Sequence, residues 1–409
     1  VLKRLPGAMA IGHNRYSTKG SSSLRNAQPI WVTYHGGDLA LAHNGQIVNA
    51  WALRKSMEEG GSIFQTTSDS EVLVHLMAAS RAGSFDGRLM GALHQIEGAF
   101  SLVAMTGDAV YAARDSHGFR PLALGRLGDG WIVASETCAF DIVEAEFLRE
   151  VEPGEVIALE PGGVRVVGRL PATPLHHCVF ELIYFARPDS LVFGESVDRV
   201  RRRLGRQLAE EHPAQADCVI AVPDSSNSAA LGYSEASGIP FELGLIRNHY
   251  IGRTFIRPGQ HLREAGVRVK YNAVRPILEG KRVVVVDDSV VRGTTSRKLV
   301  ALLRRSGVRE VHMRVASPPI TGPCYYGIDT PRKEELIAAR RPLEGIQAWL
   351  GVDSLGYLSE AGLRASVRAP GDHCYACFTG RYPVALRGED LHHEVDADRV
   401  GPPRVGAKV

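Results

Sequence analysis

Two aspartates that directly follow a run of valines are the residues of this sequence best placed to do chemistry. They are Asp287 and Asp288, in the string VVVVDDSVVRGTTS that spans Val283–Ser296. Consecutive valines suit a strand that is buried on both faces, and ligands bind beyond the carboxyl ends of the strands in open α/β sheets. Two carboxylates at that position can accept hydrogen bonds from sugar hydroxyls. We therefore expect a sugar ligand at this strand end.

The residues after the acid pair have the composition of an anion site. Gly293, Thr294, Thr295 and Ser296 stand where a helix is expected to begin, and backbone N–H groups and hydroxyls at a helix start bind phosphate. The spacing is not G-x-x-x-x-G-K-[ST], which excludes a P-loop of the nucleotide-triphosphatase kind. A plainer interpretation is a buried strand, a capped helix and two solvated aspartates, because short Gly/Thr/Ser loops are common.

A second strand end carries a similar loop. The apolar run Cys218–Val222 leads into Pro223–Ser228, which reads PDSSNS. Such a loop can receive a pyrophosphate or its magnesium ion, although strand-to-helix loops often carry Asp and Ser only as caps. Between the two loops lies Arg247–Arg275, in which basic residues outnumber the single Glu264. A charge run is usually a solvated surface, but here we expect a lid that closes on pyrophosphate.

Three motifs near the start contain residue types that suit a free amino acid. They are GHNRYST (Gly12–Thr18), AHNGQIVN (Ala42–Asn49) and TSDSEVL (Thr67–Leu73). A guanidinium can bind a carboxylate through two parallel hydrogen bonds. An amide N–H₂ and a Gly N–H can stabilise a tetrahedral oxyanion, and a carboxylate can pair with an ammonium group. Each motif also has an ordinary interpretation, because Asn-Gly is a common hairpin turn and Asp69 can simply cap a helix.

Four of the six cysteines form a further candidate site. Cys374 and Cys377 are a C-x-x-C pair, whereas Cys178 and Cys324 are distant in sequence. Such a set can bind zinc, hold an iron–sulfur cluster or be coincidental, and spacing alone does not choose between zinc and iron. The two remaining cysteines lie in apolar stretches read as strands, and we expect them to be packing residues. They are Cys138 and Cys218.

The string Val283–Ser296 closely resembles the signature of phosphoribosyltransferases. In that family the two acids contact the ribose hydroxyls and help to hold magnesium, and the loop that is here Arg292–Ser296 holds the 5′-phosphate. Ser225 aligns with a magnesium-contacting position. With the three N-terminal motifs included, the chain resembles the amidophosphoribosyltransferases from about Ala10 to Pro383.

The basic segment is similar to the lid loop of that family. The resemblance implies that Tyr250, Arg253 and Ile256 order over the substrate and line an ammonia path, and it adds Lys270 to the substrate site. Many members have Arg where this chain has His249, so the contact at that position differs.

The three N-terminal motifs resemble the glutamine-binding half of N-terminal-nucleophile amidotransferases. The resemblance implies that Arg15 pairs with the glutamine α-carboxylate, that Asn44 and Gly45 form the oxyanion hole, and that Asp69 binds the α-amino group. The family's nucleophile is an N-terminal cysteine ahead of GHNRYST, and no cysteine precedes Cys138. We therefore expect an N-terminally truncated chain that cannot hydrolyse glutamine as written but remains able to use free ammonia.

One branch of the family carries a structural [4Fe–4S] cluster. Its four ligands fall on Cys178, Cys324, Cys374 and Cys377. The resemblance implies that the cluster ties the interdomain segment, the sheet domain and the tail together without taking part in the reaction, and that its oxidation leads to loss of the enzyme.

The elements that must position these residues fall into two classes, divided near residue 170 by Pro171 and Pro174. Residues 1–165 read as short strands and tight turns with few helices, which is an α+β pattern. A hairpin is expected from Ala99–Met105 to Ala109–Ala113. The other elements expected in this half are strands at Trp131–Ala134 and Val156–Leu159 and one helix at Asp69–Ser80.

Residues 166–350 alternate strands with helices, which predicts an α/β domain with a parallel sheet covered on both faces. The expected strands are Cys218–Val222, Arg282–Val286 and Val311–Val315, and the expected helices are Val197–Glu211, Asn227–Ser237 and Ser296–Ser306. We thus expect an incomplete glutamine amidotransferase domain at 1–165, a phosphoribosyltransferase domain at 166–350, and a segment at 351–409 with cluster ligands and a disordered tail.

Composition argues against several other classes. The 409 residues are 44% hydrophobic with a net charge of +3, which is enough for two cores and gives no support for nucleic-acid binding. No apolar run approaches the roughly 18 residues of a membrane span, so no membrane partner is expected. Six cysteines are too few for a disulfide scaffold, which favours a cytoplasmic setting. The family resemblance adds a homotetramer and feedback inhibition by purine nucleotides.

The family resemblance implies an enzyme that uses glutamine-derived ammonia and Mg²⁺ to convert phosphoribosyl pyrophosphate to 5-phosphoribosylamine and pyrophosphate, the first step of purine biosynthesis. Two alternatives remain. A glutamine amidotransferase acting on a sugar phosphate, such as glucosamine-6-phosphate synthase, shares the N-terminal motifs but not VVVVDDSVVRGTTS. A phosphoribosyl-binding regulator without turnover has no need of the intact acid pair and the basic segment.

Overall fold

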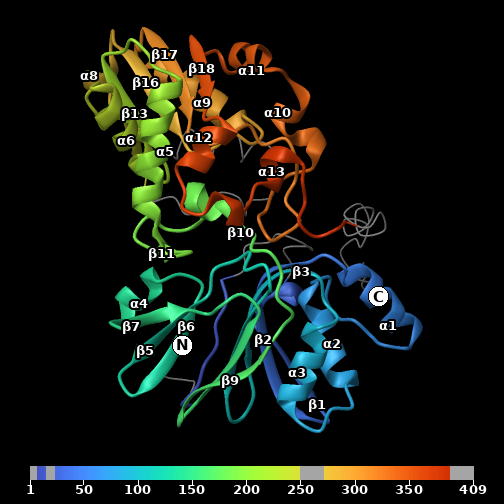
Figure 1. The fold of residues 1–409 in the computed structure, drawn as a ribbon. Coiled ribbons are helices and arrows are strands. Elements are labelled where there is room, and N and C mark those ends of the chain that lie inside the picture. The colour runs from blue at the N-terminus through green and yellow to red at the C-terminus, as the bar shows by residue number, and fades with distance from the viewer. Residues whose placement is uncertain (1–6, 15–23, 249–270, 387–409) are drawn as a thin grey trace, which may run out of the picture.

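The computed structural model describes residues 7–14, 24–248 and 271–386, which form two domains placed end to end (Figure 1). The first domain is the blue-to-green half of the ribbon, and the second is the green-to-red half. None of the described helices combines the length and the apolarity needed to cross a membrane.

An antiparallel sheet with the strand order β1-β2-β3-β4-β8-β9 forms the centre of the first domain. The hairpin expected from Ala99–Met105 to Ala109–Ala113 is present as β3 and β4, which pair Met105 with Val110. The strand expected at Val156–Leu159 is β8, one residue longer at each end. The strands of this sheet are β1 (Ile30–Tyr34), β2 (Gly37–Ile47), β3 (Gly98–Met105), β4 (Val110–Arg114), β8 (Glu155–Glu160) and β9 (Gly163–Arg169).

Helices cover one face of this sheet and a small antiparallel sheet covers the other. Leucines and valines of α2 (Ser70–Ala79) and α3 (Phe85–Leu93) pack against the side chains that β2 and β3 direct to that face. On the other face, apolar residues of β4 and β8 meet a sheet ordered β6-β5-β7. The strands of that sheet are β5 (Ala123–Leu127), β6 (Gly130–Ala134) and β7 (Glu146–Glu150).

The first domain is more helical than the sequence indicated. The helix expected at Asp69–Ser80 is α2, but α1 (Ala50–Glu59), α3 and α4 (Cys138–Val143) accompany it. Cys138 is a buried packing residue, as expected, but it begins α4 instead of lying in a strand. The short α4 contains too few residues for a helical period to stand out from the sequence.

The second domain contains the expected parallel sheet, with the strand order β13-β16-β17-β18. Val284 and Val286 pack against α5 and α6, whereas Val283 and Val285 pack against α9 and α11. The run of valines is therefore buried on both faces, as a strand between two helical layers must be. The strands are β13 (Cys218–Ala221), β16 (Arg282–Asp287), β17 (Glu310–Val315) and β18 (Ser354–Tyr357), and the helices are α5 (Val197–Glu211), α6 (Asn227–Ser237), α9 (Thr294–Arg305), α11 (Leu343–Leu350) and α12 (Glu360–Ala365).

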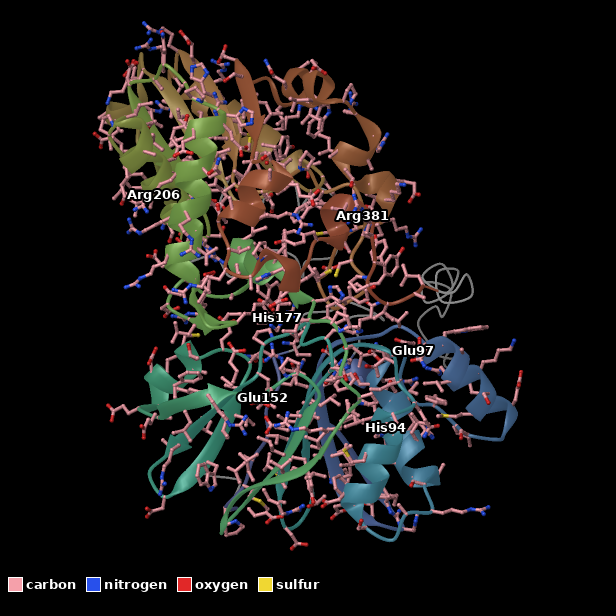
Figure 2. All side chains as sticks on the ribbon, in the orientation of Figure 1. His94, Glu97, Glu152, His177, Arg206 and Arg381 are labelled. Carbon is pink, nitrogen blue, oxygen red and sulfur yellow. The ribbon has the colours of Figure 1, made fainter. Side chains whose placement is uncertain are left out.

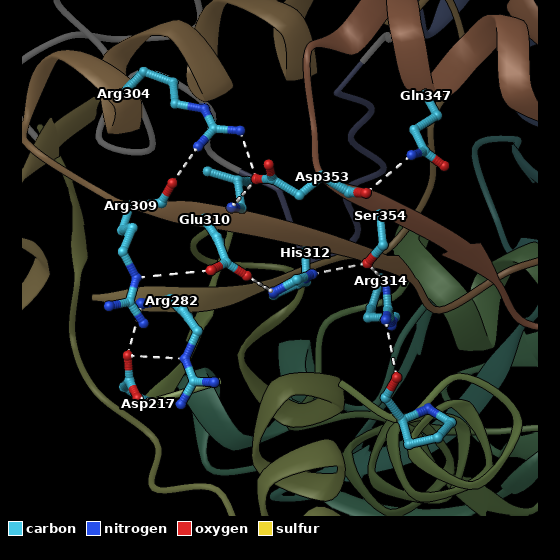
Figure 3. A network of polar contacts seen from close by, with 12 residues as sticks. Asp217, Arg282, Arg304, Arg309, Glu310, His312, Arg314, Gln347, Asp353 and Ser354 are labelled. Atoms are coloured by element: carbon cyan, nitrogen blue, oxygen red, sulfur yellow. Dashed lines mark hydrogen bonds and ion pairs between the residues drawn. The ribbon is translucent and has the colours of Figure 1, made fainter. Parts of the chain in front are cut away.

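Ion pairs and hydrogen bonds link the residues at the amino ends of these parallel strands (Figure 3). Arg304 reaches Asp353 Oδ2 at 2.6 Å, and the same carboxylate accepts the backbone N–H of Val311 at 2.6 Å. Arg282 and Asp217 form a further pair at 2.8 Å between β16 and the residue before β13. These contacts tie the amino ends of the strands to the neighbouring helix and loops.

The two domains meet around β10 (His177–Cys178), where Figure 2 labels His177 at the junction. This short strand pairs in parallel with β19 (His373–Cys374) from near the end of the described chain. Two boundaries differ from those expected, because β9 continues the first sheet past residue 165 and β18 continues the second sheet past residue 351.

Candidate functional site

The acid pair and the serine loop meet at the carboxyl edge of the second sheet. Asp287 is the last residue of β16, and β13 beside it leads into the loop at Ser225 and Ser226. The Ser225 hydroxyl donates to Asp288 Oδ2 at 2.5 Å. The Ser226 hydroxyl lies 3.5 Å from Asp287 Oδ1 and 3.4 Å from Asp288 Oδ2. The two loops singled out in the sequence therefore form one site.

Both aspartates are buried, which rules out two solvated side chains. Asp287 is 8% exposed and Asp288 is 6% exposed. Burial raises the pKa of both carboxyls, and the adjacent Asp288 charge raises the pKa of Asp287 further. Holding two carboxylates side by side away from water opposes folding. Such a pair indicates a site in which a cation or a polyhydroxyl ligand offsets that cost.

The helix that follows begins at the predicted anion site. α9 starts at Thr294, two residues earlier than expected, and no side-chain cap bonds its first turn in the described structure. Ser296 is buried and hydrogen-bonds to Asp287, whereas Thr294 and Thr295 are exposed. The free backbone N–H groups and hydroxyls of this turn thus stand beside the acid pair, as phosphate binding requires.

Gly293 and Arg292 also make contacts outside the acid pair. Gly293 has φ +74°, and a Cβ atom there would lie 2.6 Å from the Trp349 ring, so the glycine is needed for helix packing. The exposed Arg292 side chain donates to Glu335 at 3.1 Å and does not point into the acid pair's hydrogen-bond network.

The basic segment is described only at its two ends. β14 (Leu245–Arg247) and β15 (Tyr271–Ala273) pair antiparallel and bring these ends together beside the serine loop. There, Arg247 contacts Asp224 at 2.5 Å. The predicted residues Tyr250, Arg253 and Lys270 lie outside the described residues, and so does Arg15 of the first N-terminal motif.

The second and third N-terminal motifs are adjacent in the first domain. Asn44 and Gly45 lie inside β2, paired with Ser101 and Phe100 of β3, so they are not a hairpin turn. Asp69 precedes α2 but makes no side-chain cap bond to it. Its Oδ2 atom accepts the Ile47 N–H at 2.8 Å instead. The carboxylate is therefore held beside the Asn-Gly pair, where an amino acid ligand can reach both.

The four cysteines of the candidate cluster line one apolar cavity at the domain junction, together with Phe119, Phe180 and Ile328. Cys178 and Cys374 are register partners in the β10–β19 ladder. Burial raises the pKa of all four thiols, and that of Cys374 reaches about 12. Among the described residues, no three metal-ligating side chains lie close enough together to hold a single metal ion.

Arg120 places a buried positive charge next to this cavity. It is 1% exposed, and its Nη2 atom lies 2.9 Å from Glu181. In the described structure its Nε and Nη1 atoms are buried without a hydrogen-bond partner, and its charge acts on both Cys178 and Cys324. Unpaired buried N–H groups are rare because they cost free energy. Sequence reasoning missed Arg120, since no local pattern marks it.

Both halves of the chain are similar to known proteins. Residues 13–141 match the family described as a glutamine amidotransferase domain. The amidophosphoribosyltransferase of Bacillus subtilis is 49% identical over 391 residues, which cover 94% of this chain and 82% of the relative. Chloroplastic amidophosphoribosyltransferase 1 of Arabidopsis thaliana is 53% identical over 385 residues, covering 94% of this chain and 68% of the relative. The chain belongs to the amidophosphoribosyltransferase family.

A solved amidophosphoribosyltransferase structure has the same fold. The glutamine phosphoribosylpyrophosphate amidotransferase of B. subtilis, in complex with ADP and GMP, superposes with a TM-score of 0.86 at 48% identity. The superposition covers 92% of this chain and 83% of that chain, so both domains and their relative placement are included. Amidophosphoribosyltransferases are enzymes of purine biosynthesis, which agrees with the function expected from the motifs.

Sequence reasoning also overlooked the residues that hold β2 in the first domain. His43 bonds to Ser70 at 3.0 Å through Nδ1 and to the Ala99 carbonyl at 3.2 Å through Nε2. The His43 N–H donates to the Gln28 side chain at 2.7 Å. A buried histidine directly before Asn-Gly was the available signal, since a buried ring needs two partners.

Replacing Gly293 by Ala is expected to lower the free energy of unfolding by about 3 kcal/mol, because a Cβ atom clashes with Trp349 and the left-handed φ is strained. Guanidinium unfolding of the second domain measures this loss. Gly351→Ala is the matched control, since Gly351 has φ +75° with no atom within 4 Å of an added Cβ. It should cost about 1 kcal/mol. Equal losses in both variants would show that the Trp349 contact is unimportant.

Proposed function

We propose that this chain transfers ammonia to phosphoribosyl pyrophosphate at the carboxyl edge of the second sheet. The nitrogen lone pair attacks the anomeric carbon, and the bond from that carbon to pyrophosphate breaks with its electron pair. Asp287 and Asp288 bind the ribose hydroxyls, and Thr294, Thr295 and Ser296 bind the 5′-phosphate. The observation that carries the proposal is the buried acid pair beside the uncapped start of α9.

No side-chain nucleophile is needed for this step. The site positions the sugar and stabilises the charge on the leaving pyrophosphate, which are the effects that dominate transfers of this kind. Mg²⁺ would be held by Ser225, Asp287 and Asp288, whose oxygens suit a hard cation that takes the rest of its ligands from phosphates and water. When bound, the ion neutralises the pyrophosphate. The hydrogen bond from Ser225 to Asp288 already brings two of these oxygens together.

We assign glutamine binding to the first domain. Asp69 receives the α-amino group, Asn44 and Gly45 stabilise the oxyanion, and Arg15 binds the α-carboxylate. The adjacency of β2 and Asp69 supports this assignment. Glutamine hydrolysis also needs a nucleophile, which the family resemblance places ahead of Gly12.

Asp69→Asn is expected to raise the KM for glutamine about 10- to 100-fold, because a charge-assisted hydrogen bond to the ammonium group is worth about 1.5–3 kcal/mol. Asparagine can still accept the Ile47 N–H, so the fold is retained. The rate with ammonium should stay unchanged. Initial rates with each nitrogen source, in protein that carries its natural N-terminus, provide the test.

Asp86→Asn is the matched control for this variant, because Asp86 pairs with Arg165 on the surface of the same domain. It should leave both rates unaltered. A loss that is equal for glutamine and ammonium in Asp69→Asn would assign that carboxylate to folding alone.

We further propose that Cys178, Cys324, Cys374 and Cys377 hold a [4Fe–4S] cluster. A cluster of four irons is wider than one ion, which suits thiols that share a cavity without closing on a single metal. A cluster bound by four thiolates is anionic, and the Arg120 charge acts on both Cys178 and Cys324. Two nitrogen atoms of Arg120 are buried without a hydrogen-bond partner among the described residues. The cluster would join β10, the loop at Cys324 and β19, without a part in the transfer reaction.

We also propose an inhibitor class, an oligomeric state and a cellular location for this chain. Purine nucleotides are expected to inhibit the enzyme, since the B. subtilis structure contains ADP and GMP. A homotetramer is expected from the family, and light scattering would measure it. A cytoplasmic location is expected for this chain, whereas the printed names of the plant relatives place those proteins in chloroplasts.

The direct test of the proposed function follows nitrogen from glutamine to product. Protein with its natural N-terminus is incubated with phosphoribosyl pyrophosphate, Mg²⁺ and glutamine labelled with ¹⁵N in the amide. The label should appear in 5-phosphoribosylamine, with one pyrophosphate released for each glutamate formed. Glutamate formed without labelled amine would separate the two half-reactions and contradict the proposal.

A further inference from the structure

The loop that carries Cys324 rests directly on the Asn-Gly pair of the first domain. Gly327 in this loop has φ +99°, and a Cβ atom added to it would lie 2.8 Å from Gly45 Cα and 2.9 Å from the Gly45 carbonyl carbon. Real Cβ atoms do not approach other atoms so closely. The loop backbone therefore packs on the β2 backbone at the residue assigned to the oxyanion hole, and only glycine fits there.

Gly45 is confined on a second side by β3. A Cβ atom added to Gly45 would lie 2.0 Å from the Ala99 carbonyl oxygen and 2.7 Å from His43 Nε2. Behind this strand, the buried Asp115 accepts the N–H of Phe100, the ladder partner of Gly45, at 3.0 Å. The backbone of Gly45 is thus held between β3 and the loop, with no free space for movement toward either.

The loop itself is anchored by packing across the domain junction. Tyr326 stacks on Phe119 with 4.4 Å between ring centroids and 16° between ring planes. The Tyr326 hydroxyl donates to the Val384 carbonyl at 3.0 Å. Phe119 in turn accepts the Cys178 N–H at 3.0 Å through its carbonyl. The cysteine cavity and the oxyanion position are therefore parts of one packed unit.

We propose that Gly327 is a positioning residue for glutamine hydrolysis. It holds the Gly45 backbone, and through it the oxyanion donors, from the side of the phosphoribosyltransferase domain. The inference rests on the proposed role of Asn44 and Gly45. Oxyanion donors act within about 2.7–3.1 Å of the developing charge, so a displacement of a few tenths of an ångström weakens stabilisation of the transition state more than binding of glutamine.

The test replaces Gly327 by Ala in full-length protein with its natural N-terminus. The kcat with glutamine should fall at least about 10-fold, with the KM for glutamine changed less than about 3-fold. The rate with ammonium, the iron content and the visible absorbance should match the wild type. Gly351→Ala introduces the same kind of strained φ far from Gly45 and should leave both rates unchanged.

A second pair of variants keeps the test decisive if Gly327→Ala fails to fold. Tyr326→Leu removes the ring stack without adding atoms and should selectively lower the kcat with glutamine. Tyr326→Phe keeps the stack and loses only the hydroxyl bond to Val384, so it should lower that kcat less. Equal loss with glutamine and ammonium, or no loss with either, would overturn the inference and leave the proposed function standing. A wild-type enzyme inactive with both nitrogen sources would overturn the proposed function, and the inference with it.

Discussion

Replacing Asp287 and Asp288 together by Asn is expected to lower ammonium-dependent pyrophosphate release by at least about 100-fold, the loss typical of removing charged groups that a transition state needs. Both side chains keep their shape, and both can still accept from Ser225 and Ser226. The variant loses the negative charge of the two carboxylates, which binds Mg²⁺ and strengthens the hydrogen bonds that they accept from the ribose hydroxyls. Initial-rate measurements at saturating ammonium test this result.

The same double variant should be at least as stable as the wild type. Burial raises the pKa of both carboxyls, and the Asp288 charge raises that of Asp287 further, so removing the charges relieves a cost in the folded state. Asp217→Asn is the matched control at the opposite edge of the sheet, where Asp217 pairs with Arg282. It should leave the reaction unaltered. A double variant that keeps wild-type turnover would remove the acid pair from the mechanism.

Replacing Cys324 by Ser is expected to abolish the iron content and the broad visible absorbance of the purified protein. One lost thiolate leaves three ligands for a cluster that needs four. Because metal binding contributes to folding, the thermal midpoint should fall by at least about 5 °C. Iron analysis, absorbance spectroscopy and thermal unfolding, performed without air, measure the three effects.

Cys138→Ala is the control for that variant. Cys138 is buried in α4 and does not line the cavity, so its loss should leave iron and absorbance intact. Wild-type protein purified without air that contains neither iron nor the absorbance would contradict the cluster. If the purified protein instead contained one zinc ion per chain, the four thiols would be a zinc site.

The sheet of the second domain was predictable because its signals are local. Consecutive valines mark β16, and the acids and hydroxyls after them mark its ligand edge within a few residues. The helices α5 and α6 begin and end at the predicted residues. Each of these features follows from periodicity or from turn chemistry, which the sequence carries directly.

The features that were missed depend on contacts between distant segments. Asn44 and Gly45 have the composition of a turn, but pairing with β3 extends the strand through them. Gly293 is required by Trp349 and Gly327 by Gly45, and neither partner is near in sequence. Arg120 is buried and pairs with Glu181, which is also distant in sequence. Tertiary packing decided these positions, and a single sequence does not record it.

The most direct test of the central claim supplies the chain with phosphoribosyl pyrophosphate, Mg²⁺ and ammonium, and measures pyrophosphate and 5-phosphoribosylamine together. We predict that both products form in equal amounts and that neither forms without Mg²⁺. Tight binding of phosphoribosyl pyrophosphate with no pyrophosphate released would contradict it and would identify a sensor of this sugar instead of an enzyme.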